Sequence, residues 1–149
     1  MSATVLLIGI RIARLYRRRV AFWEQMNGLC GFLCNEIRYT ADCPANIFER
    51  FTWREEIWMT KQVSYFEFLQ CLSRLEQGLL LSKDEDEQVI GFYQGLGTTD
   101  LEGQLAHCGR YSRLFSHQVE QAKNLYATKG KLYRSLCALA SGMLAVLLI

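Results

Sequence analysis

Apolar residues recur at steps of three and four through most of the chain, which is the spacing that places them on one face of an α-helix. The first such series consists of Phe22, Met26, Leu29, Leu33 and Ile37. This series predicts a helix that runs from the N-terminal segment to about Tyr39. Because the helical spacing continues beyond it, the chain is expected to belong to the all-α class.

The segment TADCP, residues 40–44, interrupts this first pattern. Pro44 is expected at the first position of a second helix, where the missing N–H of proline costs nothing. The second helix is expected to present Ile47, Phe51 and Trp58. Its companion is predicted from about Ser64, and its apolar positions are Phe68 or Leu69, Leu72, Leu75 and Leu79.

The acidic run at residues 84–87 is interpreted as the start of another helix. Ser82 is a preferred N-cap residue, and Glu85 follows three positions later, so each side chain can accept a hydrogen bond from the other's free backbone N–H. Negative charge also suits the positive end of a helix dipole. A metal site is the alternative interpretation of this run, and the helix start is preferred.

Turn signals gather in the stretch GLGTTDLEGQ, residues 95–104. Gly97 can adopt the left-handed conformation that closes a helix. Thr99 is expected to cap the next helix, with Glu102 in the reciprocal position and Asp100 at the first helical position. The stretch is therefore predicted to be a corner between two helices, and not a ligand site.

The helix that follows this corner is predicted to be the longest in the chain. Its face follows steps of four and three with one polar break, Ser112; the positions are Leu101, Leu105, Cys108, Ser112, Phe115, Val119, Ala122 and Tyr126. No stop signal precedes Gly130, so the helix can continue into the apolar C-terminal segment. Together these elements predict an antiparallel bundle of about five to six helices.

Both ends of the chain are apolar. Residues 132–149 are predicted to form a transmembrane helix, which needs about 20 residues and at least about 17; a buried helix end is the alternative. The N-terminal run ATVLLIGI reaches only to Arg11, so it is too short to span a bilayer alone. The predicted organisation is a short apolar membrane segment at 1–13, a helical bundle at 14–131 and the membrane helix at 132–149.

Charge is distributed unevenly along the chain. All fifteen acidic residues lie between Glu24 and Glu120, so residues 20–128 carry nine basic and fifteen acidic side chains, a net charge of −6. The basic flanks contain Arg17, Arg18 and Arg19 on one side and Lys129, Lys131 and Arg134 on the other. Because basic residues beside membrane segments stay on the cytoplasmic side, the bundle is expected in the cytoplasm, with its six cysteines reduced.

Candidate chemistry is sparse. Cys30, Cys34, His107 and Cys108 could be imagined around a metal ion, but the short Cys-x-x-Cys spacing is missing. His107 and His117 are the only histidines, and neither neighbours a nucleophile motif or a phosphate-binding loop. The arginine run could bind nucleic acid, but anionic lipid is preferred beside an acidic body. No catalytic, cofactor or metal residue is therefore predicted.

Several motifs are similar to those of one family. The stretch EIRYTADCP contains Tyr39 and Pro44, IGIRIARLYRRR holds the first basic flank, and KLYRSLCALASG precedes the C-terminus. The most specific stretch, LGTTDLEGQ, matches at Leu96, Gly97, Thr99, Asp100, Glu102 and Gln104. On these motifs the chain resembles the stage III sporulation protein AB family over most of its length. Asp42 and Cys137 stand where the family often has proline and glycine.

The resemblance implies a membrane protein made in the mother cell, on the mother-cell side of the outer forespore membrane. Its bundle would be similar to the cytoplasmic domains of platform proteins of type II secretion and type IV pilus systems. The implied partners are the other channel proteins, including the operon's AA ATPase, together with membrane lipid and a possible second copy of the chain. A membrane-associated helical adaptor with no secretion role is the alternative.

Overall fold

The computed structural model describes residues 2–149, and the secondary structure of these residues is entirely helical. The helices are α1 (Ser2–Thr40), α2 (Pro44–Arg50), α3 (Glu55–Trp58), α4 (Phe68–Leu79), α5 (Lys83–Gly95), α6 (Leu101–Leu125) and α7 (Lys131–Leu147). A 3-10 turn at Tyr65–Glu67 precedes α4, and a π-helical turn at Tyr126–Gly130 joins α6 to α7. The predicted all-α class is confirmed.

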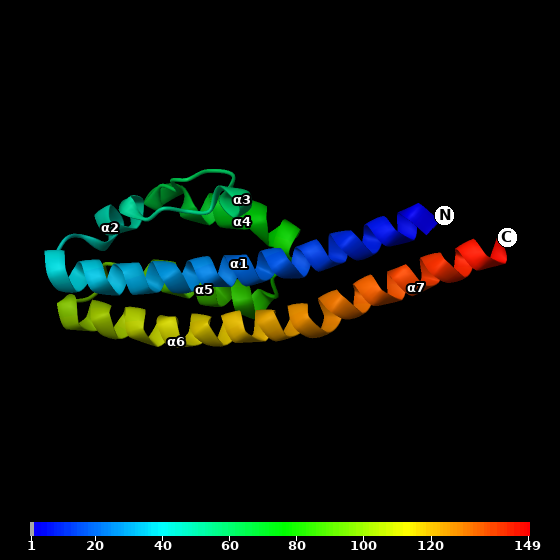
Figure 1. Ribbon diagram of the computed structural model, residues 1–149. Coiled ribbons are helices and arrows are strands. Elements are labelled where there is room, and N and C mark those ends of the chain that lie inside the picture. The colour runs from blue at the N-terminus through cyan, green and yellow to red at the C-terminus, as the bar shows by residue number, and fades with distance from the viewer. Residues whose placement is uncertain (1) are drawn as a thin grey trace.

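Two long helical rods form the frame of the molecule. Figure 1 shows α1 running antiparallel to the continuous rod of α6 and α7, with both chain ends at the same end of the molecule. The buried face of α1 carries Phe22, Trp23, Met26, Leu29, Cys30, Leu33 and Ile37, each at most 2% exposed. The predicted apolar face of α1 is therefore confirmed, and the helix ends one residue after Tyr39.

The second predicted helix is wrong, because the chain breaks it in two. The backbone is extended at Phe51 and Arg54 between α2 and α3, and Met59 adopts a left-handed conformation with φ 57°. The break turns Trp53 into the core, where its ring lies 5.5 Å from Phe48 and 4.5 Å from Trp58. The backbone N–H of Trp53 donates to the Lys61 carbonyl at 3.0 Å, a bond to a distant residue in place of a helical one.

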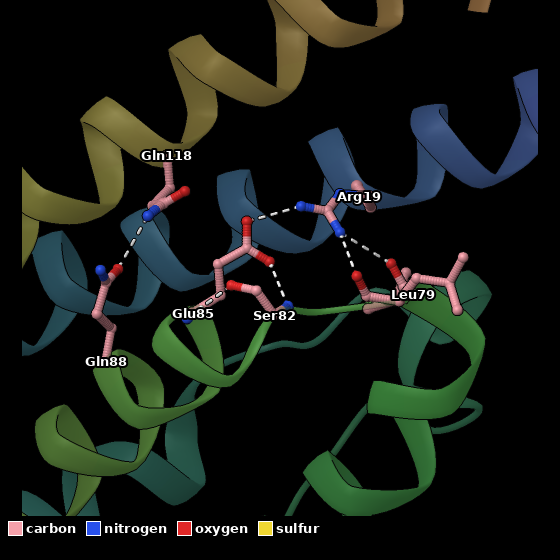
Figure 2. Close-up of polar contacts among 7 residues, drawn as sticks. Arg19, Leu79, Ser82, Glu85, Gln88 and Gln118 are labelled. Carbon is pink, nitrogen blue, oxygen red and sulfur yellow. Dashed lines mark hydrogen bonds and ion pairs between the residues drawn. The ribbon is translucent and has the colours of Figure 1, made fainter.

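Helices α2, α4 and α5 begin close to the predicted positions. Pro44 opens α2 as expected. Helix α4 begins at Phe68, which is the buried member of the predicted pair Phe68 or Leu69. The capping box that opens α5 is confirmed: Glu85 N donates to Ser82 Oγ at 3.2 Å, and Ser82 N donates to Glu85 Oε2 at 3.0 Å (Figure 2).

The rod of α6 and α7 is continuous, as the absence of a stop signal predicted. Cys108, Phe115 and Ala122 are buried on its inner face, whereas Leu101 is 49% exposed at its start. Two glutamines are also buried. One of them, Gln118, donates to Gln88 Oε1 of α5 at 3.0 Å (Figure 2), so a polar contact joins the rod to α5.

Among the described residues, no helix combines the length and the apolarity needed to cross a membrane. The predicted C-terminal transmembrane helix is therefore not supported. Helix α7 has 17 residues, which corresponds to about 25 Å at 1.5 Å per residue, and its first turn carries Lys131 and Arg134. Around Cys137, α7 packs against Gly9 in the N-terminal part of α1, and the apolar side chains beyond it are largely exposed.

Candidate functional site

The corner between α5 and α6 is a set of backbone caps. Gly97 has φ 77° and follows the last residues of α5. The N-cap of α6 is Asp100 and not Thr99: the Asp100 Oδ1 atom accepts a hydrogen bond from Gly103 N at 2.9 Å. Glu102 lies exposed in the first turn. Asp100 is favoured over Thr99 as the N-cap because aspartate is a stronger cap than threonine. Its negative charge also faces the positive end of the helix dipole.

Gln104 ties the two helices together. This side chain is only 3% exposed, and its Nε2 atom donates to the Gly95 carbonyl at 3.3 Å and to Thr99 Oγ1 at 3.1 Å. One of the carbonyls at the C-terminal end of α5 thus gains a donor that the helix itself cannot supply. Leu96, 5% exposed, packs in the core beneath the corner. Thr99, expected as the cap, is instead an acceptor for Gln104.

The remaining motif residues lie where α1 gives way to α2, at the same end of the molecule as the α5–α6 corner (Figure 1). Asp42 Oδ1 accepts from Cys43 N at 2.8 Å and lies 3.3 Å from Asn46 Nδ2, so it closes the turn before Pro44. The hydrogen bond from Asn46, then the one from Cys43, lowers the pKa of Asp42. Tyr39 is 81% exposed, which leaves its ring available for a contact outside the bundle.

Beside the corner lies a hollow of about 380 Å³ that contains His107, Arg110 and Arg113. The His107 ring stacks on Phe92 with the ring centroids 5.8 Å apart. Its Nε2 atom lies 2.9 Å from the Phe92 carbonyl oxygen, which fixes Nε2 as the protonated nitrogen. His117 Nε2 contacts Gln121 at 3.0 Å. Both histidines therefore have structural partners, and neither contacts a nucleophile through these bonds.

The buried cysteines are held as thiols. Burial raises the pKa of Cys108 to about 11, with a further contribution from Cys34, and burial also raises the pKa of Cys30. A thiolate is the form that attacks substrates and binds metals. Within residues 2–149, no group of three or more His, Cys, Asp or Glu side chains is arranged to hold a metal ion.

Arg19, which was predicted to flank the membrane, forms a bridge inside the bundle. Its Nη1 atom donates to the carbonyls of Leu79 at 3.2 Å and Leu80 at 2.7 Å, at the C-terminal end of α4. Its Nη2 atom forms an ion pair with Glu85 Oε1 at 2.7 Å, and both side chains are at most 15% exposed. Figure 2 shows that one guanidinium group thereby joins α1, α4 and α5. The acidic neighbour and the free carbonyls hold Arg19 inside the bundle.

The other basic flanking residues lie on the surface. Arg17, Lys129, Lys131 and Arg134 are exposed, around the level where the π-helical turn joins α6 to α7. Arg18 is half-buried on α1, and its Nε atom has no hydrogen-bond partner within the described chain. The structure therefore brings most of the two basic flanks together on the α1–α7 pair.

The sequence did not predict the carboxyl pair that Glu76 of α4 forms with Asp86 of α5. The hydrogen bond between Glu76 and Asp86 raises the pKa of Glu76 to about 7, and partial burial and the Asp86 charge add to the shift. The two residues are separated by the turn between their helices. No local pattern reveals such a pair, because its members meet only when α4 and α5 fold back on each other.

Comparison with known proteins gives one result. The family model described as stage III sporulation protein AB matches residues 2–149, which is essentially the whole chain. No curated protein and no solved structure matches. The all-α class agrees with the fold that the resemblance to this family implied. The chain belongs to the stage III sporulation protein AB family.

Proposed function

We propose that this protein is a non-catalytic, membrane-anchored scaffold of the sporulation channel between mother cell and forespore. Its family places it in stage III of sporulation. In this proposal the bundle faces the mother-cell cytoplasm at the outer forespore membrane. There it couples a secretion-type ATPase, the operon's AA protein, to the other channel proteins.

The observation that carries the proposal is the polarity of the α1–α7 rod pair. At the end where the termini meet, large apolar side chains are exposed on both helices. They are Leu6, Leu7, Ile8, Ile10, Leu136, Leu139, Met143, Val146 and Leu147. Exposed apolar surface of this extent marks a membrane or protein contact. Basic residues follow on the side toward the bundle, the arrangement that membrane proteins use on the cytoplasmic side.

A scaffold role accounts for the chemistry of the bundle. The two histidines bond to a backbone carbonyl and to a glutamine, and the buried cysteines are protonated. The motif residues of the corner are occupied by caps and by the hydrogen bonds of Gln104. Each of these groups is used to hold helices in place, which is what a rigid coupling element requires.

The acidic body offers a surface for a basic partner, because complementary charge speeds association. In the acidic run, Glu85 is bound to Arg19 and Asp86 is paired with Glu76, whereas Asp84 and Glu87 are exposed. The informative change is therefore Asp84→Lys with Glu87→Lys, which alters surface charge and leaves the internal bonds intact. We expect the double variant to bind the AA ATPase more slowly and with a weaker salt dependence.

A matched control reverses two exposed carboxylates elsewhere, Glu102→Lys with Glu120→Lys on α6. Equal effects of the two double variants would point to net charge alone. If neither variant changed ATPase binding, the acidic body would have no part in the coupling.

A membrane-associated adaptor with no secretion role is the alternative. Crosslinking in sporulating cells, with the partners identified by mass, separates the two functions. The scaffold proposal expects the ATPase or a channel protein among the partners, and a partner set without either contradicts it. Alkaline extraction tests the anchor: an anchored protein stays with the membrane pellet, and release into the soluble fraction contradicts anchoring.

A further inference from the structure

Helices α1 and α7 touch through small residues at two levels. A Cβ atom placed on Gly9 would lie 2.7 Å from Cys137 Sγ, so the two helices are in close contact there. One turn further along α1, buried Ala13 meets buried Gly130, where a Cβ atom would lie 4.0 Å from Ala13 Cα. A side chain larger than glycine at position 9 would therefore meet Cys137.

Two hollows adjoin this contact and share the side chains of Ile10 and Arg134. The one toward the bundle, about 300 Å³, is lined by Ile10, Ala13, Arg14, Arg17, Tyr126 and Arg134. The one toward the chain ends, about 500 Å³, is lined by Leu6, Ile10, Lys131, Arg134, Ser135, Cys137 and Ala138. Together they form a groove between α1 and α7 that is basic toward the bundle and apolar toward the chain ends.

The basic side chains of this groove are not neutralised by the fold. None of the ion pairs among residues 2–149 includes Arg14, Arg17, Lys131 or Arg134. In contrast, Arg19, two residues along α1, is committed to Glu85. Three guanidinium groups around one hollow of about 300 Å³ repel one another, and a bound anion would relieve that repulsion.

We propose that this groove is a discrete binding site for an anionic glycerophospholipid, with the phosphate held by Arg14, Arg17 and Arg134. Arginine binds phosphate through paired, charge-assisted hydrogen bonds. The apolar part of the groove, around Leu6 and Ile10, continues into the exposed apolar ends of both helices, where acyl chains have a surface to follow. A free phosphate would use only the basic half of the groove. The assignment rests on the membrane anchoring proposed above.

Vesicle flotation with the purified full chain tests the site. The probe is a series of phosphatidylcholine vesicles with increasing phosphatidylglycerol. The site variant is Arg14→Gln with Arg134→Gln. The matched control is Arg11→Gln with Lys129→Gln, which removes the same charge from the same region at exposed residues that line neither hollow. All four side chains are exposed, and circular dichroism checks that both variants keep the helical fold.

We expect both double variants to lose affinity for anionic vesicles, because each basic residue near the surface contributes to attraction. The site variant should lose about tenfold more than the control, because it also loses bonds to the phosphate. Equal losses would mean diffuse attraction and would overturn the site while leaving membrane binding intact. No vesicle binding by the unmodified chain would overturn both the site and the anchoring.

Calorimetry with glycerol phosphate distinguishes the source of the phosphate. The lipid assignment expects no saturable binding at millimolar concentrations, because the apolar half of the groove is then unused. Saturable binding of glycerol phosphate that the Arg14→Gln and Arg134→Gln changes abolish would show that the groove takes a free phosphate, and the lipid assignment would be wrong.

Discussion

Asp100 caps the start of α6 with a single carboxylate. Its Oδ1 atom accepts the Gly103 N–H, and its backbone carbonyl accepts the Gln104 N–H at 2.9 Å. Asp100 is therefore the N-cap of α6, and this cap lies one residue later than the predicted cap, Thr99. Asp100 therefore has a structural role, and its replacement should lower the free energy of unfolding more than it changes binding.

Replacing this cap gives the first prediction. Asp100→Ala should lower the free energy of unfolding by about 1 kcal/mol, within the range of about 0.5–2 kcal/mol seen for lost N-caps. Glu102→Ala is the matched control, because Glu102 is exposed beyond the cap, and it should change stability by less than about 0.5 kcal/mol. Urea unfolding measures both values. Equal losses would mean that the cap geometry is not what stabilises the corner.

Glu76 gives the molecule a pH response. Its pKa rises from 4.5 to about 7 on folding, mainly through the hydrogen bond with Asp86. A carboxyl group with a raised folded pKa stabilises the fold below its unfolded pKa, and this contribution is lost as the pH rises through the folded pKa. The free energy of unfolding should therefore fall between about pH 4.5 and pH 7.

The Glu76→Gln variant tests this response. The amide does not titrate and keeps a hydrogen bond to Asp86 available, so the downward slope over this pH range should flatten. Glu67→Gln is the control, since Glu67 is exposed in the 3-10 turn and should leave the slope as it is. Urea unfolding across the pH series provides the measurement, and an unchanged slope in Glu76→Gln would rule the carboxyl pair out as its source.

At the scale of elements, the closeness of α1 and α7 depends on Gly9. An alanine there would bring its Cβ atom within 2.9 Å of Cys137 Cβ and closer still to its sulfur, so the helices must separate. We expect Gly9→Ala to weaken the local pairing by about 1–3 kcal/mol, the range for overpacked contacts. Hydrogen exchange over residues 131–140, measured by mass spectrometry, reports the loss directly.

A double-mutant cycle shows whether Cys137 is the obstacle. In a Cys137→Gly background the Gly9→Ala change should cost far less, with a coupling free energy above about 0.5 kcal/mol. If the two changes were additive, the strain would lie elsewhere along the helix pair. Gly142→Ala is a suitable control, because nothing lies within 4 Å of a Cβ atom at that position.

At the scale of the whole molecule, the buried core and the apolar ends occupy different parts of the chain. The members of the core cluster run from Phe22 to Ala122, inside the predicted bundle at 14–131. A chain of residues 14–131 should therefore keep its helical circular dichroism and unfold cooperatively. A chain of residues 14–100 is the contrast, because it lacks α6 and exposes the α1 core face. Loss of cooperative unfolding in the 14–131 chain would show that the ends are part of the folding unit.

The sequence by itself determined the features that depend on residues a few positions apart. The Ser82–Glu85 capping box, Pro44 at the start of α2, the left-handed Gly97 and the apolar face of α1 are all of this kind. The family followed from them as well, because LGTTDLEGQ and its neighbours are local motifs. Within the LGTTDLEGQ corner the predicted cap was wrong, because Thr99 and Asp100 are both suitable N-cap residues. In the structure the Thr99 hydroxyl instead accepts a hydrogen bond from Gln104.

The tertiary structure decided whatever depends on distant partners. Arg19 has the same local surroundings as Arg17, yet it is bound to Glu85, 66 positions away, while Arg17 lines the groove between α1 and α7. The break after α2 places Trp53 in the core against Phe48 and Trp58, contacts that the spacing along the chain does not reveal. The spacing of apolar residues predicts which face of a helix is buried. It does not predict which residues of another helix that face contacts, because those residues are brought together only by folding.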